Sequence, residues 1–321
     1  MSVDPAIVVA GDALIDFEPV RLPEGDVAYR PHCGGSCLNV AIGLGRLDVP
    51  VQFLARISSD HFGRMLRAHL AESGVGTDLV LETDDLTTLA MVHLSEGGQP
   101  SYSFHASGAA DRGLTRAHLS ESSWGGILPD GAALHIGSIA LAMEPQASTL
   151  TELFLAEAGR RVLTLDPNVR TSLVTDHDTF VARIQSLARV STIVKCSDED
   201  CAAIAPDTPP EHLLHGWLED GVALVVLTEG AKPVRAWTRS ASASHQPPAV
   251  PVADTIGAGD SFMAALLADL HHTGRLSADA LGALDDAALE AILAWAATAA
   301  AHTVQHAGAN PPWTSDLPGP A

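Results

Sequence analysis

Basic side chains are scarce in this sequence. Its 321 residues contain 18 lysines and arginines against 39 aspartates and glutamates, which gives a formal net charge of −21. Only two of the basic residues are lysines, Lys195 and Lys232. A surface of this sign repels nucleic acid and anionic lipid, so neither is an expected partner. An anionic ligand must then be held by local donors and a bound cation.

Cysteines are also few, and long apolar runs are missing. The four cysteines are Cys33, Cys37, Cys196 and Cys201. They form no C-x-x-C pair, and a chain of this length is not typical of a disulfide scaffold. A metal site built on His32, Cys33 and Cys37 is not expected, because no second ligand cluster with matching spacing follows. Even Ala291–Ala301 is too short to span a bilayer, and the first residues carry no basic leader. We therefore expect a cytoplasmic protein with reduced thiols and no membrane partner.

Two common nucleotide-binding motifs are absent as well. No G-x-x-x-x-G-K-[ST] motif occurs, which excludes a P-loop enzyme. Gly43-Leu44-Gly45 is followed by Asp48 where a dinucleotide fingerprint needs its third glycine, and it falls inside a predicted helix.

The chain does contain a regular alternation of short apolar segments and amphipathic ones. The expected strands are Ala6–Ala10, Val51–Ala55, Ala133–Ile136, Val162–Asp166, Ser191–Lys195 and Ala223–Thr228. Helices are expected at Gly34–Leu47 and around Phe62–Ser73, from near Pro145, Asp178 and Glu211, and over Ala258–Thr273 and Asp286–Gln305. Such alternation favours an α/β fold with an open, mostly parallel central sheet and helices on both faces, within one domain over residues 1–321.

Five segments depart from this alternation. Thr88–Leu94 and Ser101–His105 alternate like exposed antiparallel strands joined by a turn at Gly97-Gly98. Pro19 to Pro31 is turn-rich, Ser240–Pro248 reads as a loop, and the Pro-rich tail after Pro311 is expected to fray.

The sharpest motif is Asp254-Thr255-Ile256-Gly257-Ala258-Gly259-Asp260, just before an apolar helix. A Gly-Ala-Gly turn that leads into a helix exposes backbone N–H groups with the helix dipole behind them, which makes an anion site. An isolated Asp in a first helical turn more often caps the helix. Here the small neighbours leave the Asp260 carboxylate free to face a ligand. Phosphoryl transfer needs a positioned base and stabilised charge, so Asp260 is the candidate catalytic base beside an anion hole of Gly257, Ala258 and Gly259.

This segment resembles D-T-x-G-A-G-D-x-F, the C-terminal signature of the ribokinase-like (PfkB) sugar kinases. Gly34-Gly35-Ser36 with Asn39-Val40-Ala41, followed by Gly43–Leu47, is similar to the N-terminal Gly-Gly signature of the same family. The resemblance extends from Val8 to Pro312. It implies a ribokinase-like fold whose small β lid is drawn from about 17–33 and 87–106. It also implies a kinase that uses ATP and Mg²⁺ to phosphorylate a hydroxymethyl group of a small sugar.

The resemblance also implies residue roles on the sugar side. The family's match to Asp260 takes the proton from the sugar hydroxyl. The residues expected to bind the sugar are Asp12, Asp16, Gly34, Gly35, Asn39, Phe104 and Asp260. Carboxylates and a carboxamide suit the vicinal hydroxyls of a sugar.

On the nucleotide side, Asp166-Pro167-Asn168-Val169-Arg170 resembles the family's D-x-N-x-R segment, which makes Arg170 a candidate catalytic phosphate clamp. The residues expected to bind the nucleotide are Lys195, Ser197, Thr228, Gly230, Gly257, Gly259 and Asn310. The stretch that ends at Asp200, where the family usually has Glu, is expected to organise Mg²⁺ through water together with Asn168. Asp254 and Ile256 mark the K⁺ site found in many members.

The identity of the sugar depends on a few pocket segments. Gly11–Phe17, Ser101–Phe104 and Ala109–Arg112 look most like bacterial fructokinases, although His105 stands where Tyr is more usual. A 2-keto-3-deoxygluconate kinase is the alternative, with Arg112 or Arg30 on the substrate carboxylate, and a nucleoside kinase is a further one. A silent sugar or nucleotide sensor is disfavoured because Asp260 and its glycine turn are present. The lid also implies a homodimer contact.

Overall fold

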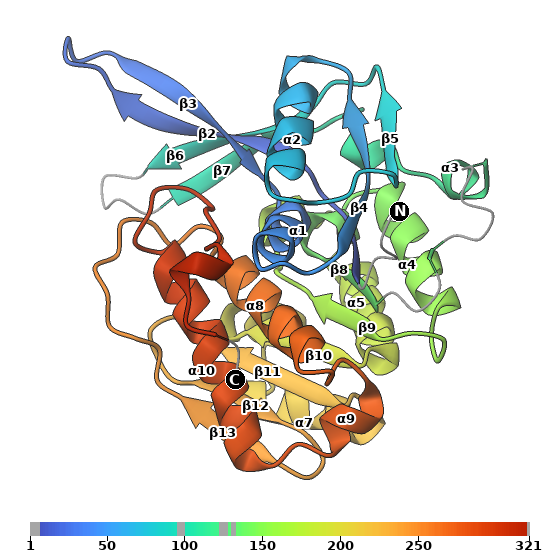
Figure 1. Ribbon diagram of the computed structural model, residues 1–321. Coiled ribbons are helices and arrows are strands. Elements are labelled where there is room, and N and C mark those ends of the chain that lie inside the picture. The colour runs from blue at the N-terminus through green and yellow to red at the C-terminus, as the bar shows by residue number, and fades with distance from the viewer. Residues whose placement is uncertain (1–6, 95–99, 122–127, 130–132, 320–321) are drawn as a thin grey trace.

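The computed structural model describes residues 7–94, 100–121, 128–129 and 133–319. Its main feature is a nine-stranded sheet in the order β13-β12-β11-β10-β9-β8-β1-β4-β5 (Figure 1). The strands are β1 (Ile7–Ala10), β4 (Val51–Ser58), β5 (Val80–Thr83), β8 (Ala133–Gly137), β9 (Leu163–Asp166), β10 (Ile193–Ser197), β11 (Leu224–Thr228), β12 (Val234–Trp237) and β13 (Ser242–His245). All pairs from β5 to β11 are parallel, and only β12 and β13 pair antiparallel. The expected open, mostly parallel sheet is confirmed.

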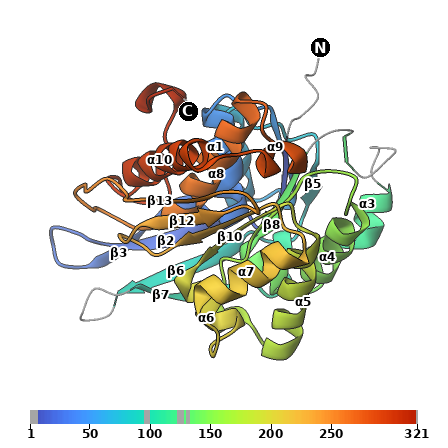
Figure 2. The ribbon, with the colours of Figure 1, turned by 90° about the horizontal axis from the view of Figure 1, so that it is seen from below.

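Helices cover both faces of this sheet (Figure 2). One face carries α1 (Ser36–Arg46), α2 (His61–Glu72), α8 (Ala258–His272), α9 (Ala278–Gly282) and α10 (Asp286–Thr303). The other carries α3 (Arg116–Glu121), α4 (Gln146–Ala156), α5 (His177–Val190), α6 (Asp198–Ile204) and α7 (Pro210–Asp220). Short 3₁₀ turns occur at η1 (Asp111–Gly113), η2 (Ser138–Leu141), η3 (Thr171–Leu173) and η4 (Thr314–Asp316). Among the helices in the described ranges, none combines the length and apolarity needed to cross a membrane.

Strand β1 shows why the sequence forms this architecture. Ile7 and Val9 pack into the apolar core on one face, and Val8 and Ala10 pack into the core on the other. All four side chains are fully buried. A central parallel strand is covered on both sides and therefore needs an unbroken apolar run, which is what the sequence provides.

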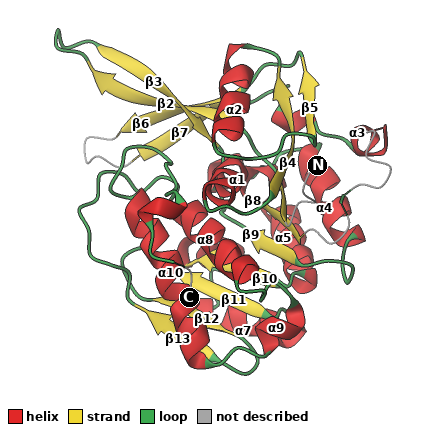
Figure 3. Ribbon diagram, in the orientation of Figure 1, coloured by secondary structure: helices red, strands yellow, loops and turns green. Residues whose placement is uncertain are grey.

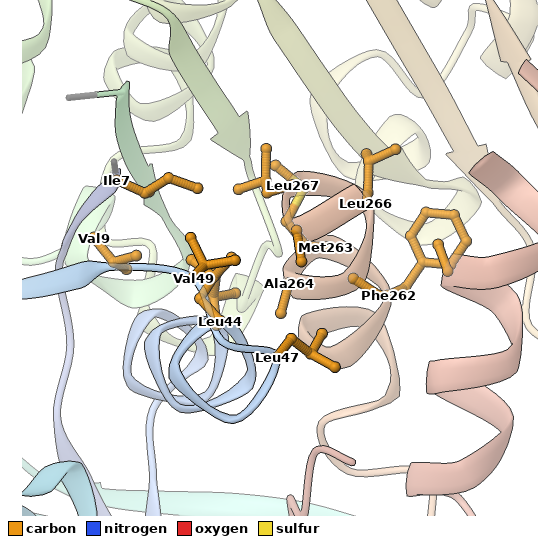
Figure 4. Packing of buried hydrophobic residues seen from close by; sticks show 14 of the residues in the cluster. Ile7, Val9, Leu44, Leu47, Val49, Phe262, Met263, Ala264, Leu266 and Leu267 are labelled. Carbon is orange, nitrogen blue, oxygen red and sulfur yellow. The ribbon is translucent and has the colours of Figure 1, made fainter. Parts of the chain in front are cut away.

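Helices α1 and α8 pack against each other on one face, and this contact builds the site. Leu44 of α1 and Leu47, just after its end, lie with Met263 and Ala264 of α8 in one buried cluster (Figure 4). A Cβ atom added to Gly43 would lie 2.6 Å from the Cβ of Ala264, so the glycine allows the two helices to approach closely. Their N-terminal ends consequently meet at one edge of the sheet.

A second, four-stranded sheet in the order β3-β2-β6-β7 lies beside the first and forms the lid (Figure 3). Its strands are β2 (Leu14–Arg21), β3 (Val27–Gly34), β6 (Thr88–Leu94) and β7 (Pro100–His105). The turn-rich interpretation of Pro19 to Pro31 is wrong, because that segment is most of a long hairpin. Pro19 is tolerated because it lies beyond Leu14–Phe17, the part of β2 that pairs with β6, and Pro31 lies on the edge strand β3. The turn predicted at Gly97-Gly98 lies outside the described residues.

Two further expectations are corrected near the C-terminus. Ser240–Pro248 is not simply a loop, because β13 occupies part of it and pairs with β12, a strand that the sequence pattern did not reveal. The polar segment Ser242–His245 has little strand character of its own. It becomes a strand through backbone pairing and through Ala243, which packs against the core. The tail after Pro311 does not fray along its whole length, since the Trp295 indole N–H donates to the Pro318 carbonyl at 2.7 Å.

Candidate active site

A cavity of about 940 Å³ lies at the carboxyl ends of the parallel strands, between them and the lid. The predicted site residues that line it are Asp12, Asp16, Gly35, Asn39, Phe104, Asn168, Arg170, Lys195, Ser197, Asp200, Thr228, Gly230, Ile256, Gly257, Ala258, Gly259 and Asp260. Residues that follow β1, β9, β10 and β11 all contribute to it. Ligand sites of open parallel sheets lie at this edge, so the structure brings most of the predicted residues to the expected place.

Asp260 lies in the first turn of α8 and is 6% exposed. Its Oδ1 accepts a hydrogen bond from Ser36 Oγ at 2.6 Å, and its Oδ2 accepts one from Asn39 Nδ2 at 2.8 Å. Both donors belong to α1, so the carboxylate faces the neighbouring helix. Burial raises the pKa of Asp260, while the hydrogen bonds from Ser36 and Asn39 act in the opposite direction. A buried, oriented carboxyl group with a raised pKa is suited to accept a proton.

The turn Gly257–Gly259 lies beside this carboxylate. Gly257 has a φ of 78°, and a Cβ there would lie 2.6 Å from the Cβ of Ala309, so the position requires glycine. A Cβ at Gly259 would lie 3.4 Å from Lys195 Nζ, which places a cation directly behind the turn. Lys195 is buried and donates to Asp166 Oδ2 at 2.7 Å. Burial alone would lower the pKa of Lys195, but the paired Asp166 carboxylate leaves it raised, so the ammonium group stays charged.

The end of the cavity next to the lid is acidic. Asp12 accepts hydrogen bonds from the backbone N–H groups of Ser36 (2.9 Å) and Cys37 (3.2 Å), so it caps α1. Asp16, on β2, has a pKa of about 7, raised first by burial and then by repulsion from Asp12. The two signature glycines stand where a side chain would collide with a neighbour or strain the backbone. A Cβ at Gly34 would lie 2.0 Å from Asp16 Oδ2, and Gly35 has a φ of 110°.

The predicted magnesium residue Asp200 has a structural role of its own. Its Oδ2 accepts from the backbone N–H (3.0 Å) and the hydroxyl (2.7 Å) of Ser197, which forms a capping box at the start of α6. Its Oδ1 accepts from the backbone N–H of Val169 at 2.6 Å. Asp200 therefore ties the loop that carries Asn168 and Arg170 to the N-terminus of α6.

Asn168 and Arg170 line the cavity and are hydrogen-bonded to each other. Asn168 Nδ2 donates to Ser36 Oγ at 2.8 Å, and Asn168 Oδ1 accepts from Arg170 Nη1 at 2.7 Å. Arg170 is exposed and reaches the cavity wall. In the sequence, Ser36 stands out only as part of the Gly-Gly signature, with no role of its own. Its place directly after two glycines at a helix start is the signal that could have found it.

Three predicted residues do not line this cavity: Gly34, Asp254 and Asn310. The Asn310 side chain is turned toward the protein body, where its Oδ1 accepts from Arg46 Nη1 at 2.7 Å. Asp254 links two loops, because its Oδ1 accepts from the backbone N–H of Ile256 (3.0 Å) and its Oδ2 from that of Gly308 (2.9 Å). Within the part of the chain that the structure describes, no group of three or more His, Cys, Asp and Glu side chains is arranged to hold a metal ion.

Comparison with known proteins gives one consistent picture. The model of the pfkB family carbohydrate kinases matches residues 4–316. A fructokinase from Rhizobium leguminosarum bv. trifolii is 36% identical over 283 residues, which cover 88% of this chain and 85% of that protein. A fructokinase with bound ATP from Xylella fastidiosa superposes with a TM-score of 0.84 at 28% identity, over 97% of this chain and 94% of that one. A fructokinase double mutant from Vibrio cholerae O395 with fructose, ADP and potassium ion bound has a TM-score of 0.80 at 26% identity, over 96% and 95%.

Proposed function

The chain belongs to the pfkB family of carbohydrate kinases and is an ATP-dependent sugar kinase, and from this premise we propose that it phosphorylates fructose with Asp260 as the general base. The observation that carries the proposal is the position of Asp260. Its buried carboxylate stands between the Gly257–Gly259 turn and the acidic, lid-covered end of the cavity.

The proposed reaction follows from this arrangement. A hydroxymethyl group of fructose lies beside Asp260, which accepts its proton as the oxygen attacks the γ-phosphorus of ATP. The new O–P bond forms while the bond between the γ-phosphorus and the bridging oxygen breaks, and ADP leaves with that electron pair. The N–H groups of Gly257, Ala258 and Gly259 stabilise the negative charge on the transferring phosphoryl oxygens. Lys195 adds positive charge behind the turn, and Arg170 holds the phosphate from the open side.

We further propose Mg²⁺ as the ion that accompanies ATP. The first turn of α6 offers Asp198, Glu199 and Asp200 to the cavity, and carboxylates with water are the ligands that Mg²⁺ accepts. Both oxygens of Asp200 already accept protein hydrogen bonds, so it would act on the ion through water. The ion supplies charge neutralisation at the phosphates. A K⁺ ion near Asp254 and Ile256 is proposed because a relative is known with potassium bound.

The charge of the sugar pocket favours a neutral acceptor over the alternative, 2-keto-3-deoxygluconate. A substrate carboxylate would face Asp12, Asp16 and Asp260. The two arginines suggested for it lie elsewhere: Arg30 is exposed on β3, and Arg112 donates to the Ala106 carbonyl and lines a separate pocket. The relatives named above are fructokinases, which supports fructose among neutral sugars.

The lid is proposed to close over the sugar and to pair with the lid of a second copy. Its outer hairpin exposes Val27 and Tyr29 (55% and 40% of their surface), and β3 is an edge strand with unpaired backbone groups. Light scattering of the wild-type protein should give a dimer mass, and a Val27→Glu variant a monomer mass. A wild-type monomer would overturn this proposal.

A cytoplasmic location is proposed because the four cysteines are free thiols.

Coupled ADP release tests the central proposal. Wild-type enzyme with Mg·ATP should turn over fructose far better than 2-keto-3-deoxygluconate, ribose, tagatose or adenosine, each measured with and without K⁺. Asp260→Asn should lower kcat by roughly 10²–10⁴-fold, the usual contribution of a positioned base. Asp279→Asn, the same change at an exposed position on α9, serves as the control and should keep wild-type kcat.

The possible outcomes separate the sugar from the mechanism. Turnover on another sugar alone, still lost in Asp260→Asn, would replace fructose and keep the base. Wild-type kcat in Asp260→Asn would overturn the mechanism. Silence of the wild type on every acceptor in this panel would overturn the fructose assignment and move the search to other sugars.

A further inference from the structure

A continuous chain of hydrogen bonds runs from Arg170 to Asp260. Arg170 Nη1 donates to Asn168 Oδ1 at 2.7 Å, Asn168 Nδ2 donates to Ser36 Oγ at 2.8 Å, and Ser36 Oγ donates to Asp260 Oδ1 at 2.6 Å. Each of the two middle groups accepts from the residue before it and donates to the next. The chain therefore starts at a cation and ends at an anion. Hydrogen bonds arranged head to tail in this way polarise and strengthen one another.

The two middle members of the chain are held in place from several sides. Ser36 is 8% exposed, and its backbone N–H is fixed by Asp12 Oδ2. Asn168 has a φ of 39°, a left-handed conformation that Asn tolerates better than most residues. The next residue, Val169, is anchored through its backbone N–H to Asp200 Oδ1. Neither middle side chain is therefore free to swing.

We propose that Ser36 and Asn168 are positioning residues that fix the Asp260 carboxylate relative to the phosphate clamp Arg170. This inference rests on the proposed function, in which Asp260 is the base and Arg170 contacts the transferring phosphate. The role of these residues is to align the Asp260 carboxylate with the Arg170 guanidinium. The base must point at the sugar hydroxyl while the phosphate lies in line with it, and small misalignments cost large factors in rate. The hydrogen bonds join the loop after β9 to α1 and α8, so the proposed base and the proposed phosphate clamp are held by one connected set of bonds.

The first test is Ser36→Ala, which removes the hydroxyl that donates to Asp260. We expect kcat to fall roughly 10–100-fold, the rate equivalent of one lost hydrogen bond to a charged group. The KM values for fructose and ATP should stay within about threefold, because the hydroxyl orients the base and not the substrates. Ser36→Thr keeps the hydroxyl and should recover most of the lost kcat.

The matched control is Ser261→Ala, the same substitution at the residue next to Asp260. The Ser261 hydroxyl is buried and accepts from Thr303 Oγ1 at 2.7 Å, on the side of α10. Its removal should lower the melting temperature and leave kcat within about threefold. If Ser36→Ala and Ser261→Ala had the same small effect on kcat, the proposed role of Ser36 would be wrong.

Asn168→Gly provides a second variant in case Ser36→Ala folds poorly. Glycine adopts the positive φ at no steric cost, so the backbone is kept while the amide is removed. We expect a loss of kcat similar to that of Ser36→Ala. Wild-type kcat in Asn168→Gly would show that this series of hydrogen bonds does not position the base, and would overturn the proposal.

A double-mutant cycle separates positioning from a merely structural role. If Ser36 acts through Asp260, then Ser36→Ala should change the residual kcat of Asp260→Ala by less than about twofold. If instead the two losses multiply, Ser36 acts independently and the proposal is wrong. Failure of the proposed function looks different, because Asp260→Ala would then retain wild-type kcat. A slow Asp260→Ala beside an unaffected Ser36→Ala would overturn only the positioning role.

Discussion

Three carboxyl groups, those of Asp12, Asp16 and Asp260, line the end of the cavity next to the lid, in a chain that has few cations to balance them. They share the space by taking different partners. Asp12 accepts hydrogen bonds from backbone N–H groups of α1, and Asp260 accepts them from side chains of α1. The Asp16 carboxyl group instead has a pKa of about 7. Three like charges in one pocket favour a partly protonated site, and they favour a neutral polyol over an anionic sugar.

The raised pKa of Asp16 predicts a specific pH dependence of stability. The folded protein binds this proton up to about pH 7, whereas the unfolded chain releases it near pH 4. The contribution of Asp16 to the free energy of unfolding of the ligand-free protein is therefore fully present below about pH 4, and it is lost as the pH rises toward 7. Asp16→Asn should melt close to the wild type at pH 5 and at a higher temperature at pH 8.

Calorimetry or dye-based melting at several pH values measures this difference. Asp26→Asn, at the exposed tip of the same hairpin, makes the same charge change outside the pocket and should show no such trend. An equal melting difference between Asp16→Asn and wild type at both pH values would contradict the assignment.

At the scale of elements, the site depends on two helix N-termini that meet. Gly43 lets α1 and α8 approach, and the approach brings Ser36 and Asn39 onto Asp260. The glycines of the α8 turn are not equivalent in this arrangement. Gly257 is required by its φ of 78° and by Ala309, whereas Gly259 has ordinary helical space around it apart from Lys195.

This difference predicts that activity and stability separate within the turn. Gly257→Ala should lower the free energy of unfolding by about 1–3 kcal/mol, the cost of strained backbone, and should also lower kcat/KM for ATP. Gly259→Ala should leave stability unchanged or raise it, because Ala is the better helix former by about 1 kcal/mol. Its methyl group should nevertheless lower kcat/KM for ATP, because it would lie 3.4 Å from Lys195 Nζ and crowd the ammonium group proposed to stabilise the phosphates. Urea unfolding and initial-rate kinetics on both variants check this, and a stable, fully active Gly259→Ala would remove the turn from the phosphate site.

At the scale of the whole molecule, the C-terminal segment packs against the C-terminal end of α1. Arg46 is buried, donates to the carbonyl of Pro311 at 2.7 Å, and places its guanidinium 5.0 Å from the ring centre of Trp313. The Thr314 hydroxyl donates to Asp48 Oδ2 at 2.7 Å. Helix α1, which begins at the cavity, is thus held at its other end by the last part of the chain.

Removal of residues 312–321 should therefore destabilise the protein by about 2–4 kcal/mol. The sum comes from a few hydrogen bonds of about 1 kcal/mol each and a cation–π contact of about 0.5–2 kcal/mol. Chemical denaturation of the shortened protein measures the loss. A shorter truncation that removes only residues 320–321 is the control and should unfold like the full chain. Wild-type stability after the longer truncation would restore the expectation of a frayed tail.

The sequence by itself determined the fold class and predicted many of the residues that line the cavity. Central parallel strands such as Ile7–Ala10 must be apolar on both faces, and this requirement is visible in one dimension. The glycines at Gly35 and Gly257 are equally visible, because the positive φ of both positions favours glycine. Both properties are local, so a local pattern records them.

Only the tertiary structure decided which partners these residues take. Ser36 and Asp260 are 224 positions apart, and their hydrogen bond exists because α1 and α8 pack side by side. The tie from Asp200 to Val169, the hydrogen bond from Arg46 to Asn310 and the strand at Ser242–His245 likewise depend on neighbours that are distant in the sequence or supplied by backbone pairing. A hydrogen bond is decided by geometry between its two groups, and for distant residues that geometry appears only when the whole chain is folded.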